Sequence, residues 1–269
     1  MKQSSWLCLT SMVFFQPTRP LQLTGKTLIV PVVSTANVSQ LAADLLVATL
    51  SLESIGIFDS SFLVPVVGSR EEGVGVCTSL ELYGKDGLDV VIVQQRSPAL
   101  KSQKHEFISA LLEFIETSGV AAVLFLSGVD LSNRTDSQMI TPTYHIHPPN
   151  ATSLATSPLA RLSELPIPEY SSPVPQYPLH SSEQPEPDVP FIPGGSLTRR
   201  ILQTLGGSKN SVPTAAILQF VLEGDNRADA ALLASAVVAV LGLNVTGFKE
   251  PRSWKQGLFG APPDQTLYG

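Results

Sequence analysis

Residues 120–128 read VAAVLFLSG, an apolar run without the alternation of polar and apolar positions that a half-exposed strand shows. Similar runs are TLIVPVV at 27–33, FLVPVVG at 62–68 and LDVVIVQQR at 88–96. Strands covered by helices on both faces are continuously apolar and rich in β-branched residues. We therefore expect these four runs to be strands of one largely parallel sheet. The stretch TSLELYG at 78–84 does alternate, which predicts a more exposed strand at the sheet edge.

Helical patterns lie between the apolar runs. Asn37 is suited to cap a helix, and a stripe at helical spacing follows it: Val38, Leu41, Leu45, Ala48 and Leu52. A second stripe, which Gly119 would end, consists of Phe107, Leu111, Phe114 and Ile115. Alternation of strands and helices predicts a layered α/β domain.

The composition changes sharply at residues 148–190, which hold 11 of the 22 prolines and few aliphatic residues. Proline lacks the backbone donor that helices and sheets use, and little apolar surface is present to offset chain ordering. The segment is therefore predicted to be a disordered or loosely draped insertion.

Three helices are expected after the insertion. The first would run from a Ser196 cap to about Leu205, and the second would lie within VPTAAILQFVLEG at 212–224. The third would lie within DNRADAALLASAVVAVLGL at 225–243. The chain thus divides into a flexible N-terminus (1–13), a single α/β domain (14–264, with the insertion 148–190) and a tail (265–269).

Composition limits the function. The net charge is −6, and the densest basic stretch is LTRRI at 197–201, which argues against a surface that binds nucleic acid. Two cysteines, Cys8 and Cys77, do not form a disulfide framework, which favours a reducing compartment. Residues 230–248 carry no charge and approach the length of a membrane span, but Ser235 and its glycines favour a helix buried on nearly all sides.

Candidate catalytic residues gather where one predicted strand ends. Ser127 and Asp130 lie at the carboxyl end of the 120–128 run, the edge at which open α/β sheets bind ligands. His105 or His145 would have to act as the base of a hydrolase, although FLSGV lacks the first glycine of a nucleophile elbow. A strand that leaves the core through a Ser-Gly turn explains the same residues.

Three further patterns could bind ions. IPGGS at 192–196 opens a helix and resembles an anion cradle, but it lacks the lysine of a P-loop. His145 with His147, and Asp225 with Asp229, each provide two metal-ligating side chains without a third in the sequence nearby. Tight turns, surface histidines and helix-capping acids account for these residues, so no metal and no cofactor is expected.

Five stretches, in order, resemble the proteasome assembly chaperone family. They are GKTLIVPVVSTANVSQLAADLLVATL (25–50), IGIFDSSFLVPVVG (55–68), IPGGSLTRRIL (192–202), VLEGDNRADAALL (221–233) and RSWKQGLFGAPP (252–263). The resemblance covers roughly residues 14–140 and 190–269, and the proline-rich insertion lies outside it. It implies a three-layer α/β/α sandwich similar to nucleoside phosphorylases, without their phosphate and base sites.

The resemblance also implies a function. Members of this family are chaperones rather than enzymes. They pair with assembly chaperone 1 as a heterodimer and help to build the α-ring of the 20S core particle, in the cytoplasm and nucleus. An enzyme of the nucleoside phosphorylase or hydrolase type that uses Ser127 and Asp130 is the alternative.

The last residues, DQTLYG at 264–269, fit the hydrophobic–Tyr–any-residue tail of several proteasome-binding proteins. By that resemblance, Leu267 would fill an apolar notch between neighbouring α-subunits, Tyr268 would add buried ring area, and the carboxylate of Gly269 would pair with a lysine. Upstream, we expect Trp254, Leu258 and Phe259 to anchor the closing segment to the domain.

Overall fold

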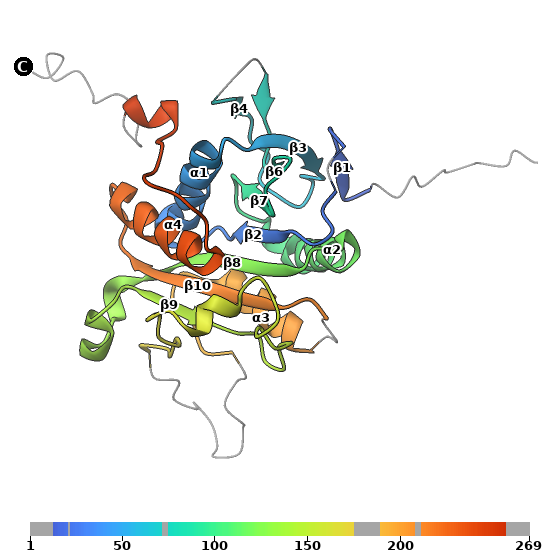
Figure 1. The fold of residues 1–269 in the computed structure, drawn as a ribbon. Helices are drawn as coiled ribbons and strands as arrows, with labels where there is room; N and C mark the ends of the chain where they lie inside the picture. The colour runs from blue at the N-terminus through green and yellow to red at the C-terminus, as the bar shows by residue number, and fades with distance from the viewer. Residues whose placement is uncertain (1–12, 21, 72–74, 175–188, 208–210, 257–269) are drawn as a thin grey trace, which may run out of the picture.

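The computed structural model describes residues 13–20, 22–71, 75–174, 189–207 and 211–256. These residues form an eight-stranded sheet with a layer of helices on each face (Figure 1). Helices α1 (Val38–Leu50) and α4 (Arg227–Leu241) pack on one face, whereas α2 (Lys104–Ser118) and α3 (Ser196–Gly207) pack on the other. The predicted three-layer α/β/α sandwich is confirmed.

The strand order is β1-β3-β6-β7-β2-β8-β10-β9. Four central strands run parallel: β7 (Val90–Gln95), β2 (Thr27–Pro31), β8 (Ala122–Asp130) and β10 (Thr214–Val221). The flanking strands pair antiparallel: β6 (Leu80–Gly84), β3 (Glu53–Phe58) and β1 (Phe15–Pro17) on one side, and β9 (Thr143–Ile146) on the other. A separate two-stranded hairpin consists of β4 (Gly68–Ser69) and β5 (Val76–Cys77).

The apolar run at 120–128 forms the central strand β8, as expected. In β8, Val123 and Phe125 belong to the core under α2 and α3, whereas Leu124 and Leu126 belong to the core under α1 and α4. Because side chains alternate along a strand, a strand between two helix layers is apolar at every position. The runs at 27–33 and 88–96 are confirmed in the same way as β2 and β7.

The segment 212–224 is a strand and not the predicted helix. Residues 214–221 form β10, which is buried throughout and pairs with β8 and β9. Ile217 packs in one core and Leu218 in the other. A short, mostly apolar segment fits a central strand as well as a buried helix, and the strand completes the sheet.

The prediction that the strand at 78–84 lies at the sheet edge is also wrong. Strand β6 lies inside the sheet between β3 and β7, and not at the edge. The alternate polar position, Glu81, is buried: it accepts hydrogen bonds from the Thr78 N–H (2.8 Å) and the Tyr83 hydroxyl (3.0 Å). The alternation therefore reflects a satisfied buried carboxylate, and not exposure to solvent.

The run at 62–68 is not a sheet strand either. Leu63 is buried and forms a single bridge with Ala99, but the chain beyond it leaves the core. Val64, Val66 and Val67 are exposed large apolar residues at the base of the β4–β5 hairpin. Pro65 interrupts the run, because it cannot donate to a strand ladder.

The other helix predictions hold, with changes at α1. Helix α2 ends before Gly119 and buries the expected Phe107, Leu111, Phe114 and Ile115. At α1, Asn37 makes no side-chain cap hydrogen bond; it and Ala36 adopt left-handed backbone angles instead. The buried stripe of α1 is wider than predicted because α1 contacts both the sheet and the neighbouring helix α4.

The proline-rich segment is partly ordered. Within residues 148–174, a short 3-10 turn, η5 (Ala160–Ser163), packs against α4, and Leu159 and Leu162 are buried in the core under α1 and α4. The Tyr170 hydroxyl donates to the Phe191 carbonyl at 3.0 Å. The expectation of a disordered or loosely draped insertion is therefore wrong for this part, because a few well-placed apolar side chains reach the core. Residues 175–188 lie outside the described residues.

Candidate functional site

The carboxyl ends of β2, β8 and β10 meet at one edge of the sheet, because these strands are parallel. This edge is the ordinary ligand site of an open α/β sheet, and it carries the predicted residues Ser127 and Asp130. The turn 34–37, which connects β2 to α1, lies across it. The contacts of this turn decide whether a ligand has room at the carboxyl edge of the sheet.

Backbone fills the edge. The Gly128 N–H donates to the Ser34 hydroxyl at 2.7 Å, and a Cβ at Gly128 would clash with the Thr35 carbonyl oxygen. The Ala36 N–H donates to the carboxylate of Glu223, just beyond β10, at 2.9 Å. The turn is thus held by β8 on one side and by the end of β10 on the other.

The IPGGS segment packs against the same turn. Gly194 has a φ of +73°, and a Cβ there would overlap the Thr35 hydroxyl. The Asp130 N–H donates to the Pro193 carbonyl (2.9 Å), and the Gly195 N–H donates to the Ile192 carbonyl (3.0 Å). The glycines therefore permit close approach of two backbone segments. This arrangement gives the predicted anion cradle no support.

Ser127 is fully buried in a network without a base. Its hydroxyl accepts from the Thr198 hydroxyl of α3 at 2.7 Å and donates to the Gly128 carbonyl at 3.3 Å. Neither partner can take its proton during a reaction, which a nucleophilic serine requires. The environment of Ser127 is that of a structural hydroxyl between β8 and α3.

The other members of the hypothetical triad have separate partners. The carboxylate of Asp130 accepts from the Ser132 N–H at 2.8 Å, and hydrogen bonds from Ser132 lower the pKa of Asp130. His145 Nδ1 lies 2.8 Å from the Ile167 carbonyl oxygen, and His145 stands on β9, two strands from β8. His105 is exposed in the first turn of α2. Asp130, His145 and His105 therefore lie in separate local environments, and no hydrogen bond within the described part of the chain joins them to Ser127.

The two predicted metal pairs are local contacts. The rings of His145 and His147 lie 5.0 Å apart, and the carboxylate of Asp225 accepts from the Arg227 guanidinium at 2.9 Å. Burial raises the pKa of Asp229 in the first turn of α4. Over the ranges that the structure describes, no group of three or more His, Cys, Asp or Glu side chains is arranged to hold a metal ion.

The uncharged segment 230–248 forms most of α4 and the turn after it. No helix in the described part of the chain is long and apolar enough to cross a bilayer. The sequence predicted a helix buried on nearly all sides, and this prediction is wrong: the outer face of α4 exposes Leu232 and Ser235. The sequence-based prediction therefore missed the uncharged outer face of α4, although the absence of charged residues from 230–248 indicated it.

The closing segment is anchored where the structure describes it. Trp254 is buried against the α1/α4 core, and the Ser253 N–H donates to the Glu71 carboxylate, beside the β4–β5 hairpin, at 3.0 Å. The predicted anchor role of Trp254 is thereby confirmed. Leu258, Phe259 and the tail residues Leu267, Tyr268 and Gly269 lie outside the described residues.

Comparison with known proteins agrees with the fold. The PAC2 family matches residues 28–244. Proteasome assembly chaperone 2 of Xenopus laevis is 34% identical over 252 residues, which cover 88% of this chain and 93% of that protein.

Two solved structures share the architecture. Pyrococcus furiosus PbaA, an archaeal homolog of proteasome-assembly chaperone, aligns with a TM-score of 0.59 and 18% identity over 86% of this chain and 88% of its own. Pyrococcus furiosus PbaB, an archaeal proteasome activator, aligns with a TM-score of 0.57 and 15% identity over 87% and 91%. These likenesses show the fold, whereas the sequence match extends over most of the chain. The chain therefore belongs to the PAC2 family of proteasome assembly chaperones.

Proposed function

We propose that this chain is a non-enzymatic chaperone that forms a heterodimer with assembly chaperone 1 and promotes formation of the α-ring of the 20S core particle, in the cytoplasm and nucleus. The observation that carries the proposal is the 34% identity, over 88% of the chain, to a relative named Proteasome assembly chaperone 2. The closed carboxyl edge of the sheet supports it, because the turn 34–37 occupies the place where an enzyme of this architecture would bind substrate.

The proposal includes the tail. Leu267, Tyr268 and Gly269 would enter a pocket between two α-subunits, with Leu267 and the Tyr268 ring in apolar contact. The anchoring of Ser253 and Trp254 supports this role, since it holds the chain just before the closing segment on the domain. Three residues give modest affinity, so the tail acts together with a broader surface.

The alternative, an enzyme that uses Ser127 and Asp130, has no support in the geometry of these two side chains. Ser127 is hydrogen-bonded to Thr198 and Gly128, and Asp130 to Ser132. Phosphate-dependent cleavage of a nucleoside by the pure protein, lost in Ser127→Ala, would restore this alternative.

The test is to co-express the chain with assembly chaperone 1 and proteasome α-subunits and to weigh the complexes by native mass spectrometry. We expect a one-to-one heterodimer that also appears on α-subunit assemblies. Tyr268→Ala should leave the heterodimer intact and weaken its association with α-subunits. A monomer that binds neither would contradict the proposed function, and unchanged α-subunit binding by Tyr268→Ala would contradict only the tail mechanism.

A further inference from the structure

The outer face of α4 is a helix surface without charge. Arg227 and Asp229 lie in its first turn, and from Ala230 to Leu241 the helix contains no charged residue. Its inner face packs in the core, but Leu232 is 44% exposed and Ser235 is also exposed. A surface helix ordinarily carries charged or polar residues on its outer face. This face is therefore adapted to something other than water.

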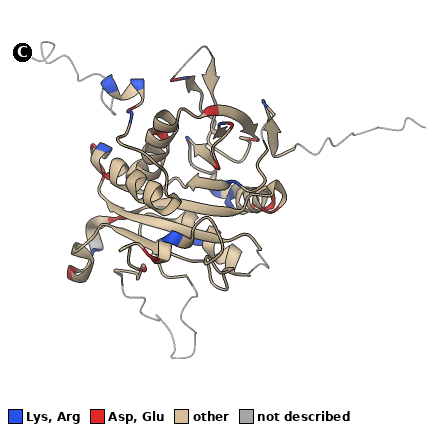
Figure 2. Cartoon of the chain, in the orientation of Figure 1, with Lys and Arg blue, Asp and Glu red and all other residues tan. Residues whose placement is uncertain are grey.

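The neighbouring helix continues this surface. Helix α1 packs beside α4, and its Leu41, Val47 and Leu50 are apolar and only partly buried. Its single charged residue, Asp44, is neutralised by a two-pronged ion pair with Arg96 at 3.0 and 3.3 Å. Figure 2 shows α1 and α4 almost free of coloured residues. We call the outer faces of α1 and α4 together the α1/α4 surface.

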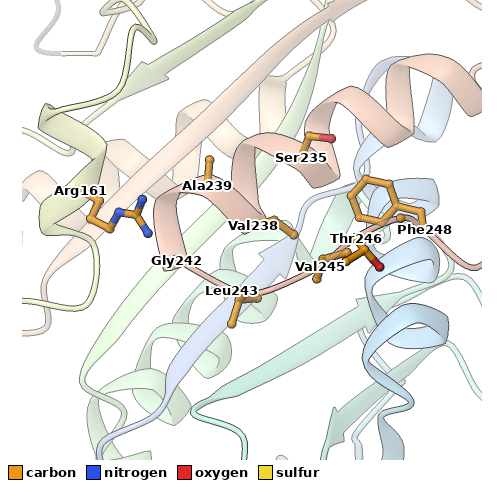
Figure 3. A pocket seen from close by; sticks show the side chains of 10 residues that line it. Arg161, Ser235, Val238, Ala239, Gly242, Leu243, Val245, Thr246 and Phe248 are labelled. Atoms are coloured by element: carbon orange, nitrogen blue, oxygen red, sulfur yellow. The ribbon is translucent and has the colours of Figure 1, made fainter.

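A pocket of about 400 Å³ opens at the C-terminal end of α4 (Figure 3). One wall consists of α4 residues, among them Val238 and Ala239, and the other of the segment that follows, with Val245 and Phe248. Arg161 of η5 lies at one end of the pocket, and the Phe248 ring lies at the other. About half of the pocket lining is thus polar, and Arg161 is its one cation.

Arg161 lies beside the end of α4 and is not paired with an acid among the described residues. Its guanidinium lies against Gly242, directly after α4, where the partial negative charge of the helix C-terminus favours a cation. Among the residues that the structure describes, no carboxylate forms an ion pair with Arg161. An arginine positioned in this way is ready to bind a carboxylate from another molecule.

We propose that the α1/α4 surface binds the partner chaperone of the heterodimer, which places an apolar side chain in the pocket between Val238 and Phe248 and an acidic side chain on Arg161. This inference rests on the proposed function and names the surface through which that function operates. A protein surface with one apolar and one acidic side chain complements the pocket, because Val238 and Phe248 are apolar and Arg161 lacks an acid in the described part of the chain.

The size of the surface fits a protein partner. Helices of 13 and 15 residues are about 20 Å long, and packed helices lie about 10 Å apart. The two helices side by side therefore span about 20 Å by 20 Å, which is wide enough to be the centre of an interface to which each partner contributes roughly 800 Å². Charged residues close to α4 in the chain, such as Lys249 and Glu250, can form the polar rim that such interfaces have.

The test compares matched substitutions on two surfaces. Leu232→Glu and Arg161→Glu change the α1/α4 surface, whereas Val67→Glu changes the exposed β4–β5 hairpin and Arg200→Glu changes exposed α3. The dissociation constant for assembly chaperone 1 is measured for each full-length variant by a native mass spectrometry titration. Circular dichroism melts check that each variant is folded, which exposed positions should permit.

We expect Leu232→Glu and Arg161→Glu each to weaken the heterodimer at least about tenfold, and both controls to stay within about threefold of wild type. Arg161→Lys keeps the charge, so its dissociation constant should lie between those of wild type and Arg161→Glu. Folded α4 variants that bind like wild type would overturn the inference while the proposed function stands. Self-association of the chain alone that Leu232→Glu abolishes, with the heterodimer unchanged, would assign the surface to a second copy and also overturn it. A wild-type chain that does not bind assembly chaperone 1 would remove the proposed function as well.

Discussion

The two helix layers of this molecule cover the same sheet but differ in charge. The α2/α3 layer carries Lys104, Glu106, Glu113 and Glu116 on α2, and Arg199 and Arg200 on α3. The α1/α4 layer carries two charges in the first turn of α4, and one, Asp44, that is paired with Arg96. The low overall charge of 15% is therefore unevenly spread over the helices. One layer is adapted to solvent, and the other is adapted to a covering surface.

Both helix layers contribute buried side chains to the core of the domain. Leu111 of α2 and Leu233 of α4 are both buried, at 2% and 0% exposure. Replacing either with alanine should lower the free energy of unfolding by about 2–5 kcal/mol, through lost burial and a residual cavity. Urea denaturation measures both. A cost well below 1 kcal/mol for Leu233→Ala alone would mean that α4 is only loosely attached without a partner.

The paired charge in α1 gives the next largest effect. Burial disfavours the charged form of Arg96, yet the Asp44 carboxylate raises the pKa of this guanidinium. Asp44→Asn leaves the cation with weaker partners at a largely buried position, so we expect a loss of about 1–3 kcal/mol. Asp225→Asn, which breaks an exposed pair with Arg227, is the control and should leave the urea midpoint unchanged. Equal effects of the two would argue against a special role for the Asp44 pair.

The contact of each layer with the sheet offers a finer test. Helix α4 meets the sheet through apolar residues such as Leu233, whereas α3 also uses the Thr198–Ser127 hydrogen bond of 2.7 Å. Thr198→Val should cost about 1 kcal/mol, because it leaves the buried Ser127 hydroxyl without this donor. A double-mutant cycle with Ser127→Ala in urea measures the coupling. Additive effects would show that the two hydroxyls contribute independently.

The sequence predicted the layered architecture because β2, β7 and β8 each contain an uninterrupted apolar run, which few other arrangements explain. It failed at β10 and β6, where local patterns did not distinguish a buried strand from a helix, or a buried Glu81 from an exposed one. These choices depend on partners distant in sequence: the Ser54 hydroxyl of β3 donates to Glu81 of β6, and β10 pairs with β8 and β9.

The candidate site was harder to predict for a similar reason. Ser127, Asp130 and the IPGGS segment do come together at one edge, as their positions suggested. Their chemistry depends on the turn 34–37, whose left-handed Ala36 and Asn37 no motif indicated. Likewise, Arg161 lies within a segment expected to be disordered, and nothing in its local sequence connects it to the end of α4.

The smallest expected effect concerns pH and the sheet edge on the α1/α4 side. On β9, Tyr144 and Ile146 pack in the α2/α3 core, so His145 and, just beyond the strand, His147 face the other layer. Burial, and then the neighbouring His145, lower the pKa of His147 from its ordinary 6.5.

In the unfolded chain, this imidazole therefore takes up a proton at a higher pH than in the folded chain. Above about pH 6.5 both forms are neutral and His147 contributes no pH dependence. As the pH falls through 6.5 towards the lower folded-state pKa, the unfolded state gains a proton first, so the free energy of unfolding should fall. Urea denaturation at several pH values should show a shallower decline in His147→Gln than in wild type, with the difference at pH 8 defining the packing cost of the substitution. Parallel curves would mean that His147 is as well solvated in the folded protein as in the unfolded chain, and that the α1/α4 side of the sheet edge is more open than its burial indicates.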